Sequence, residues 1–226
     1  MKKIQLILVL FLTSQLNAQF LNEIGFFAGG TNYSGDIGNE MYIMPNRVGG
    51  SIVYKRNVNS RISIRTTASY LPIADDDANS SNIVRQRRNY SFSNTIVEVA
   101  MGLEFSYLDY DITSSYNNYT PYIVVEFAGM YYDAASSRVN GENNYTNKMS
   151  YAIPFGLGFK SKITDRIAYA VESRAHYTFV DDLDFNNENI PQLNFGNPNN
   201  NDWYFFTGVS LVYSFGRPPC AVSPRY

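Results

Sequence analysis

The sequence predicts an all-β protein, an eight-stranded antiparallel up-and-down transmembrane β-barrel. About eight segments alternate between apolar and polar residues with a period of two, as strands with two different faces do. Aromatic residues make up 15% of the chain although only 17% of it is charged. After the first residues, no stretch approaches the ~18 apolar residues of a transmembrane helix, so a membrane crossing would have to use strands.

Residues 1–18 have the features of a secretory signal peptide. Two lysines precede a short apolar run, and Asn17-Ala18 forms a small-residue cleavage site. The apolar run is too short to cross a bilayer as a helix. We therefore expect an exported chain in which residues 19–215 form one barrel in the cell outer membrane and residues 216–226 form a periplasmic tail.

The alternation predicts eight strands, with the cleanest pattern in the third. There, Ile62, Ile64 and Tyr70 lie opposite Arg65 and Ser69. A soluble sandwich with one wet face would also alternate, but the many outward aromatic residues favour a membrane barrel with interfacial girdles. The expected strands lie near residues 23–33, 46–56, 61–73, 94–107, 120–132, 150–161, 166–178 and 202–215.

The connections between these strands alternate in length, as those of bacterial barrels do. Short turns at residues 57–60 and 164–165 and a medium connection at 108–119 are expected on the periplasmic side. The second half of the medium connection is rich in tyrosine, so the alternative that it extends a neighbouring strand stays open. The long outer loops are expected near residues 34–45, 74–93, 133–149 and 179–201.

Residues at every second position of a strand face the same side, and we call this alternation parity. At the positions whose parity points inward, positively and negatively charged residues occur in equal number, which predicts a lumen filled by paired side chains. A narrow eight-stranded barrel has room for such pairs and little else, so a diffusion pore is disfavoured. The predicted inward charges are Lys55, Arg61, Arg65, Lys160 and Arg174 against Glu23, Glu98, Glu104, Glu126 and Glu172.

The sequence offers little for catalysis. His176 is the only histidine, and its parity points it into the lumen beside Glu172 and Arg174, whereas a lipid-modifying barrel would need it exposed to the bilayer. One His and one Cys are too few for a nitrogen and sulfur metal site. The net charge of −2 argues against binding nucleic acid. We expect a non-enzymatic protein without cofactor or metal.

Two carboxylate runs, Asp75 to Asp77 and Asp181 to Asp184, fall in expected outer loops. Neither has the spacing of an EF-hand, so we expect solvated loop charges. Arg85, Arg87 and Arg88 form a basic patch beside the first run. They are expected to pair with it, and binding of lipopolysaccharide phosphates is the alternative.

The only cysteine, Cys220, lies in the tail behind Arg217, Pro218 and Pro219. The prolines hold the chain extended, which would present the thiol to the periplasm. An odd cysteine in an oxidising compartment indicates either a disulfide with a partner or an idle thiol.

Several motifs in order along the chain resemble those of one known family. They are EIGFFAGGTNYSGDI at residues 23–37, DDANS at 76–80 followed by RRNYSF at 87–92, IPFGLGFK at 153–160, DWYFFTG at 202–208 and FGRPPC at 215–220. Together the motifs resemble the PorG family, the small outer-membrane barrel of the bacterial type IX protein secretion system.

This resemblance implies a protein that ties a periplasmic ring of the lipoprotein PorK and its partner PorN to the outer membrane. The implied partner-binding surface is the periplasmic side, formed by the turns at 57–60, 108–119 and 162–165 and the tail. It also implies that Tyr213 and Phe215 in the last strand are a signal for barrel assembly. The alternative is a structural or adhesive surface barrel of the OmpA or OmpX kind, which would bind ligands through its outer loops.

Overall fold

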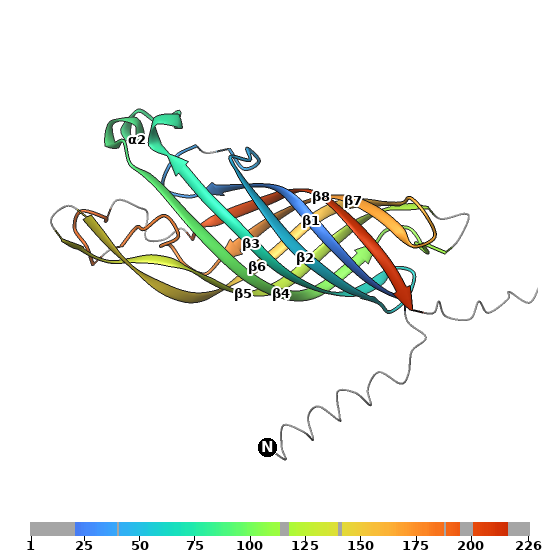
Figure 1. Cartoon of the computed structure of the whole chain (residues 1–226). Coiled ribbons are helices and arrows are strands. Elements are labelled where there is room, and N and C mark those ends of the chain that lie inside the picture. The colour runs from blue at the N-terminus through green and yellow to red at the C-terminus, as the bar shows by residue number, and fades with distance from the viewer. Residues whose placement is uncertain are drawn as a thin grey trace, which may run out of the picture.

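Eight antiparallel strands form a closed barrel in this computed structural model, which describes residues 21–39, 41–113, 118–139, 142–187, 189–194 and 201–216. Each strand pairs with its sequence neighbours, and β8 closes the ring on β1 (Figure 1). The predicted fold class is confirmed. The strands are β1 (Leu21–Ser34), β2 (Arg47–Asn57), β3 (Ile62–Asp76), β4 (Ser91–Ser106), β5 (Tyr119–Val139), β6 (Glu142–Lys162), β7 (Ile167–Thr178) and β8 (Trp203–Gly216).

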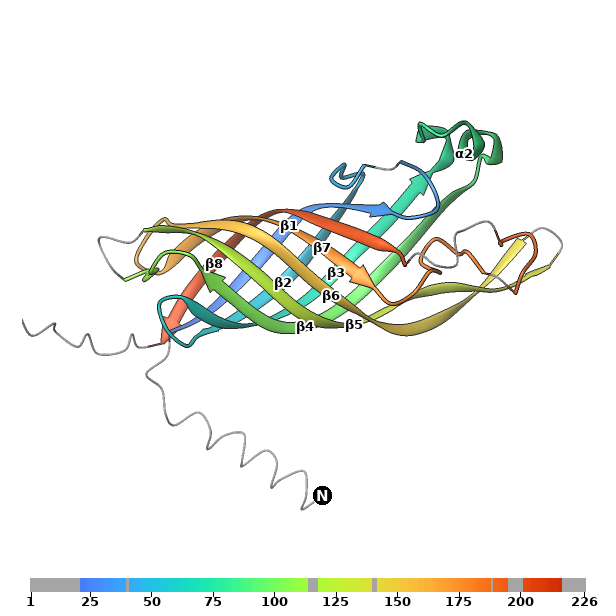
Figure 2. The same ribbon diagram turned by 180° about the vertical axis from the view of Figure 1, so that it is seen from behind.

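The two ends of the barrel differ. The start of β1 and the end of β8 lie at one end, together with the connections β2–β3, β4–β5 and β6–β7 (Figures 1 and 2). The opposite end carries the other four connections, including two short helices, η2 (Asp77–Asn79) and α2 (Ile83–Arg88). With the termini inside the cell envelope, these are the periplasmic and outer ends. None of the described helices is long and apolar enough to cross a membrane.

The expectation of an outer loop at 133–149 was wrong, because most of this segment is strand. β5 and β6 are 21 residues long each, about twice the 9–11 residues that a crossing needs. Beyond the pairs Val97 with Tyr131 and Ala152 with Thr178, they pair only with each other. Residues 132–139 and 142–151 therefore form a two-stranded hairpin extension, visible at the outer end of the barrel (Figure 2).

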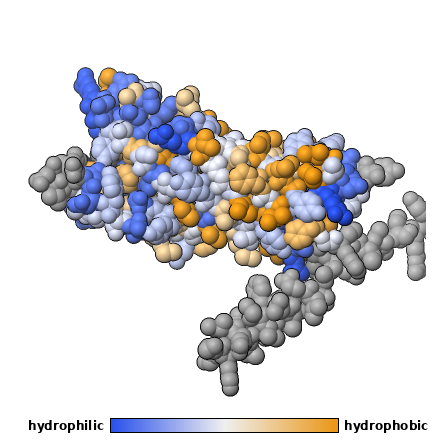
Figure 3. All heavy atoms as spheres, in the orientation of Figure 1, coloured by the Kyte–Doolittle hydropathy of each residue, from blue (hydrophilic) through white to orange (hydrophobic). Residues whose placement is uncertain are grey.

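The outward face of the strands carries a continuous apolar belt over the periplasmic half of the molecule (Figure 3). Aromatic side chains contact one another on this face, such as the stacked pair Tyr119 and Phe159 and the edge-to-face pair Phe155 and Trp203. Such a belt is stable only in lipid, so the chain is a barrel of the outer-membrane type. The exposed belt residues include Ile24, Phe26, Ile52, Val99, Met101, Leu103, Ile123, Val125, Phe127, Leu157, Val171, Val209 and Leu211.

The interior of the barrel is filled in two layers. The outer layer is an apolar cluster with fully buried Leu71, Ile96 and Phe206, extended by loop residues Leu183 and Leu193. The layer nearer the periplasm consists of charged and polar side chains that are almost all below 5% exposed. The sequence predicted the charged layer but not the apolar one, because both have the same inward parity.

Candidate functional site

The charged layer is centred on three carboxylates that share four cations. The carboxylate oxygens of Glu104 lie 2.5 Å from the ammonium nitrogen of Lys55 and 2.7 Å from that of Lys160. A guanidinium nitrogen of Arg65 lies 3.4 Å from the same carboxylate. These groups come from β2, β3, β4 and β6, so the network ties opposite walls of the barrel together. Tyr122 lies between the two ammonium groups, with its ring centroid 5.3 and 5.6 Å from them.

Arg65 forms a bidentate pair in the interior. Its two terminal nitrogens donate to Glu172 at 2.6 and 2.9 Å, and its Nε lies 3.7 Å from Glu126. Arg174 bridges the same two carboxylates at 3.0 and 3.3 Å, and its guanidinium lies 5.4 Å from the ring centroids of both Phe27 and Phe206. Bidentate geometry and a dry setting make such pairs strong but costly to break.

His176 faces the interior, as its parity predicted, but its hydrogen-bond partner is Glu98. Its Nδ1 lies 3.0 Å from the Glu98 carboxylate, and its ring stacks on Tyr204, whose hydroxyl donates to the same carboxylate. The Nε2 atom has no hydrogen-bond partner among the described residues. Within that part of the chain, no three His, Cys, Asp or Glu side chains gather in a way that could hold a metal ion.

The prediction that Arg61 belongs to the lumen network was wrong. Its side chain is about half exposed and pairs with Asp109 of the β4–β5 connection at 2.7 Å, with Ser60 donating to the same carboxylate. β3 begins only at Ile62, so Arg61 belongs to the turn and parity no longer fixes its direction. The hydrogen bond from Arg61 holds the pKa of Asp109 below its usual range.

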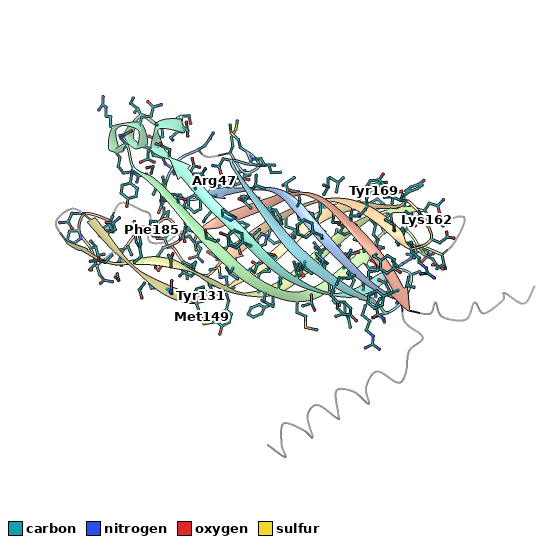
Figure 4. The ribbon with its side chains drawn as sticks, in the orientation of Figure 1. Arg47, Tyr131, Met149, Lys162, Tyr169 and Phe185 are labelled. Atoms are coloured by element: carbon teal, nitrogen blue, oxygen red, sulfur yellow. The ribbon has the colours of Figure 1, made fainter. Side chains whose placement is uncertain are left out.

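The periplasmic end is closed by the β4–β5 connection. Tyr110 and Ile112 are buried there against Ala168, with Leu21 packed beside them. Lys160 of the charged layer lies 4.7 Å from the Tyr110 ring centroid, so the closure rests directly on the network. This end also holds Lys162 and Tyr169, opposite Arg47 at the outer end (Figure 4).

The outer end is closed by loops, and here the expectation of solvated carboxylates was wrong for Asp77 and Asp184, whereas the other members of the two runs are partly exposed. Asp77 is fully buried and receives two hydrogen bonds from Arg88, at 2.6 and 2.8 Å. Burial raises the pKa of Asp77, but Arg88 and the backbone N–H groups of Gly38 and Tyr90 outweigh it and lower the pKa. The expected pairing of the basic patch with the first acidic run is therefore present for Arg88.

Arg85 uses its guanidinium differently. It donates to the backbone carbonyls of Gly35 and Gly38, at 3.0 and 3.1 Å, and so fastens α2 to the β1–β2 loop. Arg87, the third member of the patch, is exposed on α2.

Asp184 of the second acidic run is also fully buried, beside Asp202. The hydroxyl of Tyr33 contacts both carboxyl groups although it has one hydrogen to donate, so a proton on one carboxyl satisfies the arrangement. Burial, with repulsion from Asp36 and Asp181, raises the pKa of Asp184 to about 7. Burial and the neighbouring Asp184 likewise raise the pKa of Asp202. Sequence parity gave no sign of this cluster, because its members meet only when the loops fold.

We expect the loop that carries Asp184 to open as the pH rises. A carboxyl with a raised folded-state pKa stabilises the fold fully below its unfolded pKa of ~4 and loses that contribution as the pH rises through the folded value. For Asp184, the pH range over which this stabilisation is lost therefore extends up to about 7. Asp77, with a lowered pKa, loses its contribution only in acid, outside this window.

Limited proteolysis of the β7–β8 loop, normalised to cleavage of an unfolded peptide, should be several-fold faster at pH 8 than at pH 5. Asp202→Asn removes one titrating group and keeps one acceptor oxygen, enough for Tyr33 but not for the Leu183 N–H as well, which donates to the other oxygen of Asp202. The cleavage rates of this variant at pH 5 and pH 8 should therefore be closer to each other than those of the unchanged protein. An unchanged pH dependence in this variant would contradict the assignment.

Comparison with known proteins places the chain in a family. Residues 1–224 match the family model described as "Domain of unknown function (DUF6089)". The chain belongs to the DUF6089 family. In the sequence comparison with curated proteins, none matches.

This DUF6089 barrel is also similar to solved outer-membrane barrels. A major outer membrane protein from Thermus thermophilus shares 12% identity at a TM-score of 0.48, covering 86% of this chain and 99% of that one. The N-terminal β-barrel domain of Pseudomonas aeruginosa OprF shares 8% identity at a TM-score of 0.47, covering 88% and 99%. Ail of Yersinia pestis shares 9% identity at a TM-score of 0.47, covering 87% and 99%.

The remaining sequence predictions for this DUF6089 member concern β8 and the tail. Tyr213 and Phe215 lie on the outward face, 45% and 41% exposed, where a lipid-facing role and an assembly signal are both compatible. Arg217, Pro218, Pro219 and Cys220 lie outside the described residues, as does the signal segment.

Proposed function

We propose that this protein is a non-enzymatic outer-membrane anchor whose periplasmic end binds the periplasmic ring of a type IX secretion system, through PorK-like and PorN-like proteins. The observation that carries the proposal is the filled interior. Two closed ends, an apolar layer and a network of buried ion pairs leave no transport path among the described residues. A barrel without a path acts through its surfaces.

The periplasmic end offers a partner both charge and shape. A pocket of about 470 Å³ lies where β1 and β8 meet, with apolar walls from Leu21 and Phe215 and a charged rim from Asp165 and Arg166. Asp165 of the rim pairs with Lys162 at 2.8 Å, and the exposed pair of Arg61 with Asp109 lies at the same end of the barrel. Apolar pockets with polar rims are the common form of protein interfaces. The resemblance to the PorG family supplies the identity of the partner.

We expect Arg166→Glu to reduce co-purification with the ring lipoprotein and surface export of type IX cargo several-fold. The matched control is Arg87→Glu, the same change on an exposed arginine of α2 at the outer end. Both variants are compared with a deletion strain, in which export should be lost. Normal export in the deletion strain would overturn the proposal.

The second candidate, adhesion through the outer end, is favoured by one observation. The hairpin extension and α2 project beyond the apolar belt (Figure 3). Under this alternative, Arg87→Glu or a shortened hairpin extension would reduce attachment of cells to surfaces while Arg166→Glu leaves both attachment and export intact.

A further inference from the structure

The β1–β2 loop contains an exposed apolar segment that the proposed function does not use. Met41, Tyr42, Ile43 and Met44 are consecutive, and each is between 53% and 68% exposed. No charged residue occurs from Met41 to Asn46. In the β7–β8 loop, by contrast, Leu183 and Leu193 are fully buried in the barrel mouth.

The segment lies against the outer wall of the barrel. Gly30 faces outward on β1, and Pro45 packs so closely over it that a Cβ there would lie 2.3 Å from the proline ring. The backbone N–H of Asn46 donates to the Thr31 carbonyl at 3.0 Å, and the Tyr42 ring lies 5.9 Å from that of Phe205 on β8. The loop is therefore folded back along β1 and β8.

Asn32 supports this position. It is 2% exposed, and its amide donates to the Tyr42 carbonyl at 2.9 Å. An unpaired carbonyl is costly in lipid, where no water replaces the lost hydrogen bond. The buried amide thus provides a backbone partner that a segment at the membrane interface needs.

The segment continues the apolar belt. Asn32 pairs with Phe205, and Ala28 pairs with Val209, an exposed belt residue on the same outward face. Four residues along β8 correspond to about 13 Å of strand. Exposed Arg47 lies three residues after Met44, at the outer end of the barrel, and supplies a cation close to the segment (Figure 4).

We propose that Met41–Met44 inserts into the outer leaflet and binds the acyl chains of its lipids, with Arg47 at the level of the headgroup phosphates. Continuity with the belt, the lack of charge and the Asn32 hydrogen bond favour lipid over a protein partner. The loop fixes the depth of the barrel in the membrane. This proposal is independent of the secretion role.

The test measures the depth of a nitroxide label at Ile43→Cys in a Cys220→Ser background, in vesicles of phosphatidylcholine and phosphatidylglycerol. Leu211→Cys in the belt and Gln86→Cys on α2 are the lipid and water references. The ratio of oxygen to nickel-chelate accessibility at position 43 should lie near that of position 211 and several-fold above that of position 86. A ratio equal to that at position 86 would overturn the proposal, and so would shielding from both reagents, which indicates protein contact.

A pair of glycine variants tests the docking of the loop on the wall. Gly30→Ala displaces Pro45, whereas a Cβ at outward-facing Gly50 on the next strand meets no atom closer than 3.6 Å. Gly30→Ala should lower the accessibility ratio of the label at position 43 at least twofold, and Gly50→Ala should leave it unchanged. Equal ratios in the two variants would contradict the placement against β1.

Discussion

Arg65→Met is expected to lower the free energy of unfolding by about 3–5 kcal/mol, the usual cost of removing one partner from a buried ion pair. Arg65 is 1% exposed and serves three carboxylates, of Glu104, Glu126 and Glu172, at 2.6 to 3.7 Å. Methionine fills similar volume, so the loss reflects charge rather than a cavity. The measurement is urea unfolding of the barrel in lipid vesicles, followed by the fluorescence of Trp203.

The matched control is Arg61→Met, four residues earlier in the chain. Arg61 pairs only at the surface, with a half-exposed Asp109, so no measurable change in unfolding is expected. In the double variant Arg65→Met with Glu172→Gln, the free energy of unfolding should fall by less than the sum of the two single changes. Each substitution removes the charge that the other would leave unpaired. An Arg65→Met barrel as stable as the control would contradict a structural role for the network.

The second large effect is expected where the barrel closes. Gly29 of β1 and Gly208 of β8 are register partners, and a Cβ on either would lie 2.2 Å from a backbone carbonyl oxygen of the other strand. Backbone atoms held in a hydrogen-bonded ladder cannot yield as a side chain can. Gly208→Ala is therefore expected to lower the free energy of unfolding by about 3 kcal/mol, near the upper end of the effects of inserting extra atoms into a packed structure.

The folded fraction after refolding into detergent micelles, read from the heat-dependent shift in gel mobility, measures this effect. Gly129→Ala is the control, since a Cβ at that exposed glycine of β5 would meet no atom within 4 Å. The Gly208→Ala variant should fold in markedly lower yield than Gly129→Ala. Equal yields would show that β1 and β8 can separate to admit the methyl group.

Part of the candidate site was predictable from parity. An inward position on a strand stays inward in any barrel, so Glu98, Glu104, Glu126, Lys160, Glu172 and Arg174 all lie in the interior. Parity does not specify partners across the lumen, and it placed His176 beside Glu172 and Arg174 when its contact is with Glu98. It failed for Arg61, which lies one residue before its strand.

The loops were the least predictable region. Asp77 and Asp184 look like solvated charges in sequence, since runs of acidic residues between strands usually are. Their burial depends on Arg88, Tyr33 and Asp202, which lie at least 11 residues away in the chain, and 151 in the case of Tyr33 and Asp184. No local pattern encodes such contacts.

By itself, the sequence determined the eight strands, their direction and which side chains face lipid. A period of two marks each strand and its two faces, the aromatic residues distinguish the lipid face, and the alternating connection lengths set the direction. Only the tertiary structure decided which charges pair, that the outer half of the interior is apolar, that β5 and β6 continue as a hairpin extension, and that the Met41–Met44 segment lies on the outer wall. These features depend on the closure and tilt of the barrel, which bring together strands and loops far apart in the chain.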